Sequence, residues 1–344
     1  MKKHFLAASF LLSAMTTFGA GYQLNLQGVR QLAMGGSGTA WPWDASTIFY
    51  NPGGLARLKG IQVYGSFMSI APVTAYGNAI DGTGTVSQHR TFTPINIYIG
   101  GPIQEGSKFA LGLGIYSTAG MGLTWDDNWL GKYIVQSVDM KSICFQPTLS
   151  YRVSDFLSIG AGFVYAAGSL DMRMALPVHG YQGPGLDDGQ ALLHGNTTGV
   201  GCNLGIQMRP SENLQLGLTY RSQLTMDLGG GTAKFKVPYS MQQSFPDTHF
   251  DTQLPIPQVA SFGLGWRLGD VTLQFDLNYT VWNTVDSLRF NFTQNTSALQ
   301  NIHAPRHYRN TLTPRLGANY KISRIVSVMV GGAFDPTPVT NNYV

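Results

Sequence analysis

Long stretches of strictly alternating apolar and polar residues most constrain what this chain can fold into. In residues 214–228, LQLGLTYRSQLTMDL, the even positions are apolar apart from Ser222, and the odd positions, including Arg221 and Asp227, are polar or glycine. Residues 271–285, VTLQFDLNYTVWNTV, repeat the pattern. Each stretch is about 15 residues long, whereas strands of globular proteins usually have 5 or 6. Such strands predict an all-β fold, a transmembrane antiparallel β-barrel.

The connections between strands support the same fold. Long loops, such as 173–196 and 231–255, alternate with short turns, such as RVSDF and RPSEN. This is the up-and-down order of outer-membrane barrels, in which short turns face the periplasm and long loops face outward. A soluble β-sandwich is the alternative, but it needs shorter strands and two buried sheet faces. The pattern predicts eleven strands, near residues 60–70, 91–101, 108–119, 133–152, 157–172, 197–209, 213–230, 256–268, 270–289, 308–322 and 325–335.

The first residues have the pattern of a secretory leader. Lys2 and Lys3 precede an apolar run, and small residues follow near Gly19, which predicts a signal peptide over residues 1–19 and a mature start at Ala20. A transmembrane anchor is the alternative. The remaining chain has no apolar run of about 18 residues, which excludes helical membrane spans.

The charge composition also limits the possible partners. Only 12% of the residues are charged, about half the fraction typical of soluble proteins. Removing Lys2 and Lys3 from the 22 basic residues leaves 20 against 18 acidic ones, a net charge of +2. This balance predicts no nucleic-acid partner. The low charged fraction indicates that something other than water meets much of the surface.

Several motifs resemble those of the FadL-type outer-membrane transporters of long-chain fatty acids and other hydrophobic compounds. The segment AGYQLNLQGVRQLAMGGSGTA followed by DASTIFYNPGGLA resembles the N-terminal hatch of that family, which ends in Asn-Pro-Ala and here reads Asn51-Pro52-Gly53. Further matches are GLGIYSTAGMGLTWDDNW, QPTLSYRVSDFLSIGAGFVY and AFDPTP. The resemblance covers nearly the whole chain, and the hatch is its most specific part.

The resemblance implies three segments and a transport function. These are the signal peptide 1–19, a hatch or plug over residues 20–59 inside the lumen, and a barrel over residues 60–344. The family barrel has fourteen strands, so with eleven present the barrel is expected to be C-terminally incomplete. The implied function is passive passage of long-chain fatty acids by a monomer in the outer membrane, without a cofactor. The alternatives are uptake of aromatic hydrocarbons, or a structural, adhesin-like barrel without transport.

The residues of the hatch fit a plug physically. Gly35, Gly36 and Gly38 permit close packing, and Pro52 ends the plug through its fixed backbone geometry. A periplasmic linker of the same length is the alternative, but the segments LAM, WPW and IFY are too apolar to be solvated.

The resemblance also implies a lateral opening at the third predicted strand. In this family substrate leaves the lumen sideways where that strand bends inward beside the hatch. Gly120 falls at the bend, and Ser117 lies where the family has a lumenal binding residue. Glycine accepts torsions that other residues resist and weakens strand pairing, although glycine at the mouth of a loop is also common.

Three arginines are candidates for binding a substrate carboxylate. Arg173 aligns with a family arginine that contacts it, but simple alternation puts Arg173 on the outward face, level with Asp171, as part of a plain surface pair. Arg221 and Arg315 face the lumen by parity. Either could bind a carboxylate strongly where water is scarce. They could equally pair with lumenal carboxylates such as Asp227 and Asp276.

The outer loops contain MALPVHGYQGPGL and KVPYSMQQSFPDTHF, which are rich in Met, Pro and aromatic residues. The resemblance implies that they form a hydrophobic groove that captures substrate. Contact with lipopolysaccharide is the alternative.

Signs of enzymatic chemistry are weak. The segment GGSGT, residues 35–39, lacks the last glycine of a nucleophile elbow, and His303 and His307 have metal-ligand spacing without an acidic or cysteine partner nearby. We therefore expect no catalytic residues and no metal. The two cysteines are expected to be free thiols: Cys202 faces lipid, and Cys144 faces the lumen, where a water-soluble thiol reagent should reach it.

Overall fold

The computed structural model describes residues 22–24, 26–78, 82–178 and 188–340. The predicted signal peptide lies outside these residues, as do residues 20 and 21 of the predicted hatch. No helix in the described ranges has the length and apolar character needed to cross a membrane.

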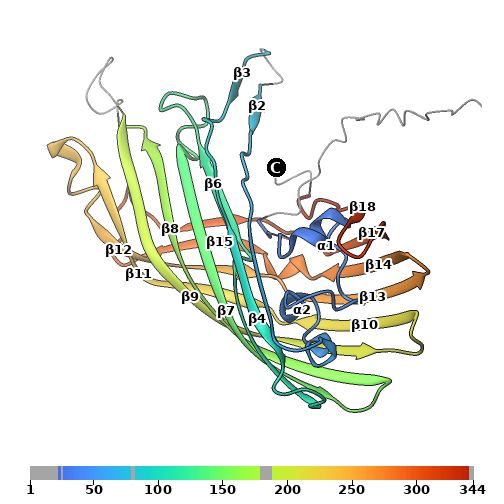
Figure 1. Cartoon of the computed structure of the whole chain (residues 1–344). Coiled ribbons are helices and arrows are strands. Elements are labelled where there is room, and N and C mark those ends of the chain that lie inside the picture. Colours follow the sequence, from blue (N-terminus) through green and yellow to red (C-terminus); the bar gives the residue numbers. More distant parts are fainter. Residues whose placement is uncertain (1–21, 25, 79–81, 179–187, 341–344) are drawn as a thin grey trace, which may run out of the picture.

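One strongly curved antiparallel sheet forms the body of the molecule (Figure 1). Eleven of its strands, here called the wall, follow one another in chain order, as the sequence predicts. They are β1 (Gln62–Phe67), β4 (Ile95–Pro102), β5 (Phe109–Tyr116), β7 (Ser137–Arg152), β8 (Leu157–Leu176), β9 (Gly189–Met208), β10 (Leu214–Arg221), β13 (Val259–Leu268), β14 (Val271–Thr280), β17 (Thr311–Lys321) and β18 (Ser327–Ala333). Among the described residues, β1 pairs only with β4, and β18 pairs only with β17. The wall is that of a transmembrane β-barrel, which confirms the predicted fold class.

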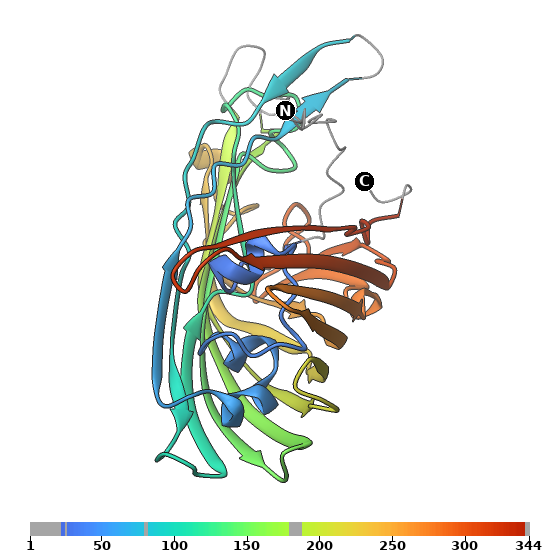
Figure 2. The same ribbon diagram turned by 45° about the vertical axis from the view of Figure 1, so that its right-hand side comes forward.

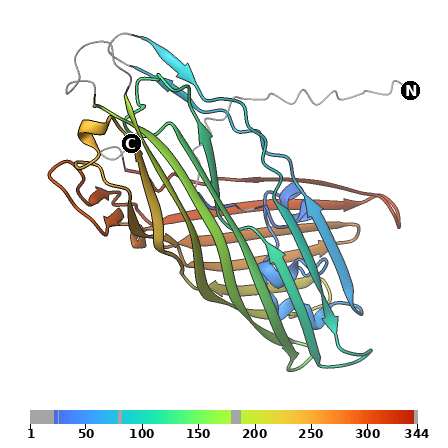
Figure 3. The same cartoon turned by 90° about the vertical axis from the view of Figure 1, so that its left-hand side faces the viewer.

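The two faces of the wall differ in chemistry. In β8, Ile159, Phe163 and Tyr165 are exposed on the outer face, whereas Ser158 and Val164 are buried on the inner face. The same alternation runs through β7 and β9, the two long strands that flank β8 in the sheet (Figure 3). An outward apolar band of this kind is typical of a surface that meets hydrocarbon.

Shorter elements extend the sheet on the side of the long loops. β9 pairs with β10 along its second half and with β11 along its first half, so the sheet divides there. Phe250, Phe290 and Phe292 form part of the apolar core of this extension. The additional elements are β2 (Ala75–Gly77), β3 (Gly84–Val86), β6 (Gly120–Thr124), β11 (Leu224–Lys236), η3 (Tyr239–Met241), β12 (Thr248–Ile256), η4 (Trp282–Thr284), β15 (Ser287–Phe292) and β16 (Ile302–Pro305).

The single strand predicted over residues 213–230 is wrong. β10 ends at Arg221, and β11 begins at Leu224 with different partners. Ser222 and Gln223 lie between the two strands, and Ser222 still donates its backbone N–H to the Cys202 carbonyl. The side-chain faces are exchanged across these two residues, so Leu224 is buried and Asp227 is exposed, the opposite of the predicted faces. Because the period of a strand is two, a local irregularity of this kind places every later side chain on the other face.

Residues 22–24 and 26–58, here called the plug, lie against the concave inner face of the wall (Figure 2). They contain the short helices α1 (Val29–Ala33) and α2 (Thr47–Tyr50) and the 3-10 helix η1 (Pro52–Arg57). η1 packs against β7, β8 and β9. The plug has no long regular element, so most of its backbone polar groups need partners from elsewhere.

The two cysteines lie on the predicted faces of the wall, but the predicted accessibility of Cys144 is wrong. Cys144 is fully buried, and its Sγ lies 3.4 Å from Thr118 Oγ1. Tyr116 and Val164 belong to the same apolar cluster. Cys202 is half-buried and has the parity of the exposed Val200.

A thiol-labelling experiment tests this packing. In the folded protein we expect a water-soluble maleimide to leave Cys144 unmodified, because a buried thiol is closed to the reagent. In denaturant both cysteines should react. Mass spectrometry of peptides that contain Cys144 and Cys202 measures each site separately. Rapid labelling of Cys144 in the folded protein would contradict the packing described here.

Candidate functional site

Amide side chains of the wall bind the backbone of the plug helix α2. Asn203 donates from Nδ2 to the carbonyl oxygens of Phe49, at 2.9 Å, and of Ile48, at 3.2 Å. Gln146 donates from Nε2 to the same Ile48 oxygen at 2.8 Å. A helix of one turn leaves its last carbonyls without helical partners, so the wall supplies the missing donors.

Asn51 joins the plug to itself and to the wall. Its Nδ2 lies 2.9 Å from the Thr39 carbonyl oxygen and 3.0 Å from that of Ile206 in β9. Its Oδ1 accepts from the backbone N–H of Gly53 at 3.1 Å and so caps η1, which Pro52 begins. The side chain is 1% exposed. The predicted motif is therefore a buried junction, and its role in gating stays a prediction.

Glycines on the inner face of the wall let the plug approach closely. A Cβ atom at Gly205 would lie 2.2 Å from Asn51 Oδ1, and one at Gly217 would lie 2.1 Å from the Thr39 carbonyl oxygen. Both distances are far below contact. The glycine-rich inner face is thus shaped to the plug.

The plug contributes glycines of its own, as predicted. Gly35 and Gly36 have φ angles of 70° and 81°, in the left-handed region that favours glycine. A Cβ at Gly35 would lie 2.5 Å from the carbonyl oxygen of Gly332, and one at Gly36 would lie 2.3 Å from Arg315 Nη1. Conformation therefore favours glycine at both positions, and at Gly35 the backbone of Gly332 also leaves no room for a side chain.

The wall is interrupted after β5, where the lateral opening is predicted. Tyr116 pairs with Cys144, and Gly120 at the start of β6 pairs with Lys141, so three residues oppose two on β7. Such an extra residue is a β-bulge, which bends a strand and breaks its pairing.

The N-terminal end of the plug covers this interruption. The backbone N–H of Leu24 donates to the Thr118 carbonyl at 2.8 Å, and that of Gly120 donates to the Tyr22 carbonyl at 3.4 Å. Gln23 and Ala119 form an antiparallel bridge. Residues 22–24 thus take the position that a neighbouring strand would have.

The bend involves both predicted gate residues through their backbones. Ser117 contributes its carbonyl oxygen, which accepts from Gln27 Nε2 at 2.5 Å. Gly120 does not have the left-handed conformation that would demand glycine, and a Cβ there would lie 3.2 Å from Leu24 Cδ1. The bend therefore comes from the extra residue, and glycine at 120 leaves room for the plug. Binding of substrate by Ser117 stays a prediction.

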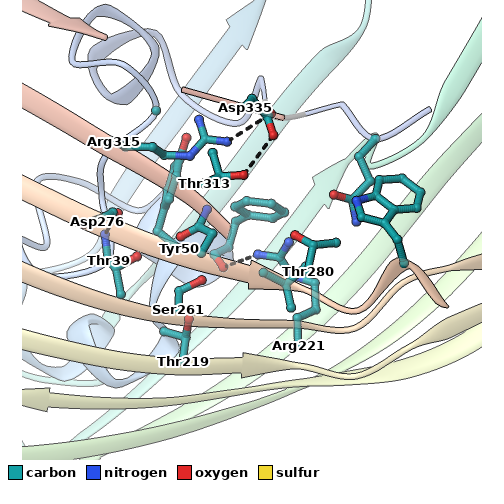
Figure 4. Close-up of a pocket in the computed structure, with 16 residues that line it drawn as sticks. Thr39, Tyr50, Thr219, Arg221, Ser261, Asp276, Thr280, Thr313, Arg315 and Asp335 are labelled. Carbon is teal, nitrogen blue, oxygen red and sulfur yellow. Dashed lines mark hydrogen bonds and ion pairs between the residues drawn. The ribbon is translucent and has the colours of Figure 1, made fainter. Parts of the chain in front are cut away.

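Two small cavities lie between the plug and the wall, and Arg221, Phe49 and Gln23 line both. The first is polar and is shown in Figure 4; among its lining residues are Thr39, Thr219, Ser261, Asp276, Thr313, Arg315 and Asp335. The second is more apolar; its lining includes Leu24, Tyr116, Val164, Leu224 and Ile256. Arg221 therefore stands where a polar space meets an apolar one.

Arg221 is held by an aromatic ring rather than by a carboxylate. Its guanidinium carbon lies 3.7 Å from the centre of the Phe49 ring, and Nη2 donates to the Phe49 carbonyl at 3.1 Å. The buried Nε has no hydrogen-bond partner in the described part of the chain. The predicted pairing of Arg221 with Asp227 is wrong. Asp227 lies beyond the strand break, and its Oδ1 accepts a hydrogen bond from Gln253.

Arg315 and Asp276 are both engaged with the plug. Arg315 Nη1 donates to the Gly35 carbonyl at 3.1 Å, and its Nη2 lies 3.8 Å from Asp335 Oδ2. Asp276 Oδ2 accepts from the backbone N–H groups of Gly38 and Thr39 at 2.8 and 2.9 Å. The two side chains anchor neighbouring parts of the plug (Figure 4).

Arg173 lies apart from Arg221 and Arg315. It lines neither cavity, and its Nη2 lies 2.6 Å from Oδ1 of Asp127. The surface pairing that alternation predicts is thus observed, with Asp127 rather than Asp171 as the partner. A role for Arg173 in binding stays a prediction. In the described ranges no group of three His, Cys, Asp or Glu residues is placed to hold a metal ion.

The amides that bind the plug were not predicted from the sequence. Asn203 and Gln207 occupy inward positions in NLGIQM, and Gln146 occupies one in β7. Asparagine and glutamine at inward positions between glycines can be recognised in the sequence as candidates for buried hydrogen bonding. Their partners cannot be recognised there, because the plug is about 100 or more residues away in the chain.

Comparison with known proteins decides the family. Residues 10–343 match the model of the outer membrane protein transport protein family (OMPP1/FadL/TodX). The chain belongs to this family. FadL-family relatives include the long-chain fatty acid transport protein of Escherichia coli K12, 24% identical over 98% of this chain and 83% of that protein. The wall and plug superpose on a Pseudomonas aeruginosa FadL homologue with a TM-score of 0.75, at 22% identity over 94% of this chain and 82% of that one.

The same fold occurs in a toluene transporter. The crystal structure of Pseudomonas putida TodX has a TM-score of 0.70 at 16% identity and covers 89% of this chain and 82% of that chain. The resemblance predicted from the hatch motif is confirmed. As a member of the FadL family, the chain is an outer-membrane transport protein with a multi-pass β-barrel fold.

Replacing one wall glycine should loosen the plug. In Gly217→Ala the added methyl would collide with the Thr39 carbonyl, and overpacking of this kind typically costs about 1–3 kcal/mol. We expect faster proteolytic cleavage within residues 38–51 of the intact, inserted protein. Gly65→Ala is the matched control, because nothing lies within 4 Å of a Cβ at Gly65. Equal cleavage rates in the two variants would contradict the proposed fit.

Proposed function

We propose that the chain carries long-chain fatty acids across the outer membrane by passive diffusion, without a cofactor and without catalysis. The observation that carries the proposal is the position of Arg221. The half-buried Arg221, whose buried Nε–H has no acceptor among the described residues, stands at the junction between a polar and an apolar cavity. An amphiphile with one carboxylate and one hydrocarbon chain matches both sides of this junction.

The chemistry of the junction favours a carboxylate over a neutral ligand. A guanidinium forms short, charge-assisted hydrogen bonds with carboxylate oxygens, and these strengthen where water is scarce. The acyl chain would lie along Leu24, Val164 and Ile256, which line the apolar side. Arg221 is thus the proposed ligand. Arg315 is a second candidate that would first have to release the plug.

Entry of a substrate requires the plug to move. The two cavities measure only about 40 and 20 Å³, and one water molecule has a share of about 30 Å³ in the liquid. Gln23 and Phe49 separate the cavities, and both belong to the plug. Displacement of these side chains would join the two spaces around Arg221.

We propose that substrate leaves sideways at the interruption after β5. Only the N-terminal end of the plug, residues 22–24, fills the place of a pairing strand there. In this scheme residues 1–19 are the signal peptide, residues 20–59 are the hatch and residues 60–344 are barrel. The Asn51-Pro52-Gly53 junction holds the rest of the hatch in place while its end moves.

The relatives support a hydrophobic substrate and suggest a second candidate. The E. coli relative is named as a long-chain fatty acid transport protein, and the P. putida TodX structure is described as a toluene transporter. Aromatic hydrocarbons are therefore the second candidate substrate, and they would not need Arg221. We propose that the protein acts as a monomer and that its aromatic outer loops contact lipopolysaccharide or capture substrate.

Loss of the Arg221 charge should separate the two substrates. In Arg221→Gln we expect oleate to bind about 10-fold to 100-fold more weakly, because a hydrogen bond to a charged group contributes about 1.5–3 kcal/mol. Toluene binding should not change. Oleate and toluene binding to the purified protein, with radiolabelled oleate uptake in a host that lacks its own transporter, measure the effect.

Arg324→Gln is the control for Arg221→Gln, because it removes an equal charge from an exposed position outside both cavities. Unchanged oleate binding in Arg221→Gln would exclude Arg221 as the carboxylate ligand. An absence of both oleate and toluene uptake by the wild-type protein would favour a structural barrel.

The lateral route is tested by filling the space beside the bend. In Gly120→Val the new side chain would press on Leu24, since even a Cβ lies 3.2 Å from Leu24 Cδ1. We expect a narrower opening and at least a several-fold lower rate of oleate uptake, with oleate binding and membrane insertion retained. Gly65→Val in β1 serves as the matched control. Normal uptake by Gly120→Val would favour a path straight through the plug.

A further inference from the structure

Three arginines surround an open cavity at the end of the wall that carries the short turns. Arg57 is the last residue of η1, Arg152 is the last residue of β7, and Arg209 follows β9 directly. The turns after β7 and β9 complete the lining of a cavity of about 450 Å³. This cavity, here called the turn-end cavity, is far larger than those around Arg221. In outer-membrane barrels such turns face the periplasm.

The positive charges at this cavity are poorly neutralised. None of the three arginines forms an ion pair with a carboxylate in the described ranges, although Asp155 and Glu212 also line the cavity. Burial, and after it the charges of Arg209 and Arg152, lower the pKa of Arg57 from its ordinary value, whereas the charge of Asp155 raises it. The guanidinium groups therefore repel one another, and the charge of Asp155 offsets this repulsion only in part.

Free N–H groups remain available for a ligand. Arg57 donates from Nε to Ser158 Oγ and from Nη1 to the Asp155 carbonyl, both at 2.8 Å, but its buried Nη2 has no partner in the described part of the chain. The side chain of Arg209 makes no hydrogen bond within those residues either; only its backbone N–H bonds, to Phe156. A buried donor without an acceptor is costly unless a ligand supplies one.

Apolar surface adjoins the charges on both sides. Phe156 lines the turn-end cavity and is 50% exposed. A second cavity of about 280 Å³ shares Arg57 and Arg209, and its lining includes Trp41 and Trp43 of the plug. The turn-end cavity therefore has basic side chains at its centre and aromatic side chains at its margins.

We propose that the turn-end cavity is an oxyanion-binding site, formed by Arg57, Arg152 and Arg209, for a carboxylate or phosphate group carried on an apolar chain. Guanidinium groups bind both oxyanions with paired hydrogen bonds. Phe156 and the two tryptophans would contact the attached chain. This site shares no lining residue with the two cavities around Arg221, and it does not depend on Arg221 or on passage of a substrate.

Protection of arginines from phenylglyoxal tests this site in the intact protein in non-ionic detergent. Modification of Arg152 and Arg209 is followed by peptide mass spectrometry at constant ionic strength, with inorganic phosphate or decanoate added. We expect either anion to slow modification of both residues at least threefold. Arg324, an exposed residue of another short turn, is the internal control and should react at an unchanged rate.

The two probes distinguish the source of the oxyanion. Protection by decanoate at a tenfold lower concentration than phosphate would identify an amphiphilic carboxylate, and equal protection would identify a free or headgroup phosphate. In Arg209→Gln, protection of Arg152 should fall at least threefold. If neither anion protects Arg152 more than Arg324, or if Arg209→Gln leaves the protection intact, the proposed site does not exist.

Discussion

The structure depends on one constraint: an irregular backbone enclosed by a barrel must find hydrogen-bond partners on the barrel wall. The plug is mostly non-helical, and its buried carbonyl and N–H groups would be costly without partners. Asn203, Gln146 and Asp276 supply donors and acceptors from three different strands. Glycines such as Gly205 and Gly217 allow the backbones to come close enough for these bonds. The polar, glycine-rich inner face of the wall is thus explained by the plug.

The contacts of the plug are unevenly distributed, and this difference suits a gate. Around Asn51 the plug is held by several buried side-chain hydrogen bonds to β9 and by close glycine contacts. At its N-terminal end, Leu24 and Tyr22 meet the interrupted strand through backbone bonds, and the buried Tyr22 ring packs edge-on against Trp282. Regions with fewer buried contacts open at lower free energy than the rest of a fold. In the proposed scheme the end of the plug moves while the junction at Asn51 stays in place, and the contact between Tyr22 and Trp282 must then break.

The alternation of apolar and polar residues predicted the strands of the wall well. In a strand with lipid on one side and a polar lumen on the other, every second side chain is apolar. It failed at Ser222 and Gln223, where two ordinary polar residues end one strand and shift the faces of the next. For the site, parity correctly placed Arg221 and Arg315 in the lumen. It could not identify their partners, Phe49 and Gly35, because these contacts join residues 172 and 280 positions apart. Such pairings depend on the curvature of the wall around the plug and leave no local signal.

The long reach of the plug has a consequence for assembly. Met34 and Gly35 pack on Gly317 and Gly332 in the last two strands described, although they lie near the start of the chain and are synthesised early. Contacts of such large sequence separation form slowly, because loop-closure entropy must be overcome before they contribute. Ile48 packs on Gly112 in β5, but Trp41 packs on Gly265 in β13, so successive parts of the plug meet strands that are synthesised at different times. The plug therefore reaches its final packing only after the last strands of the wall have been added.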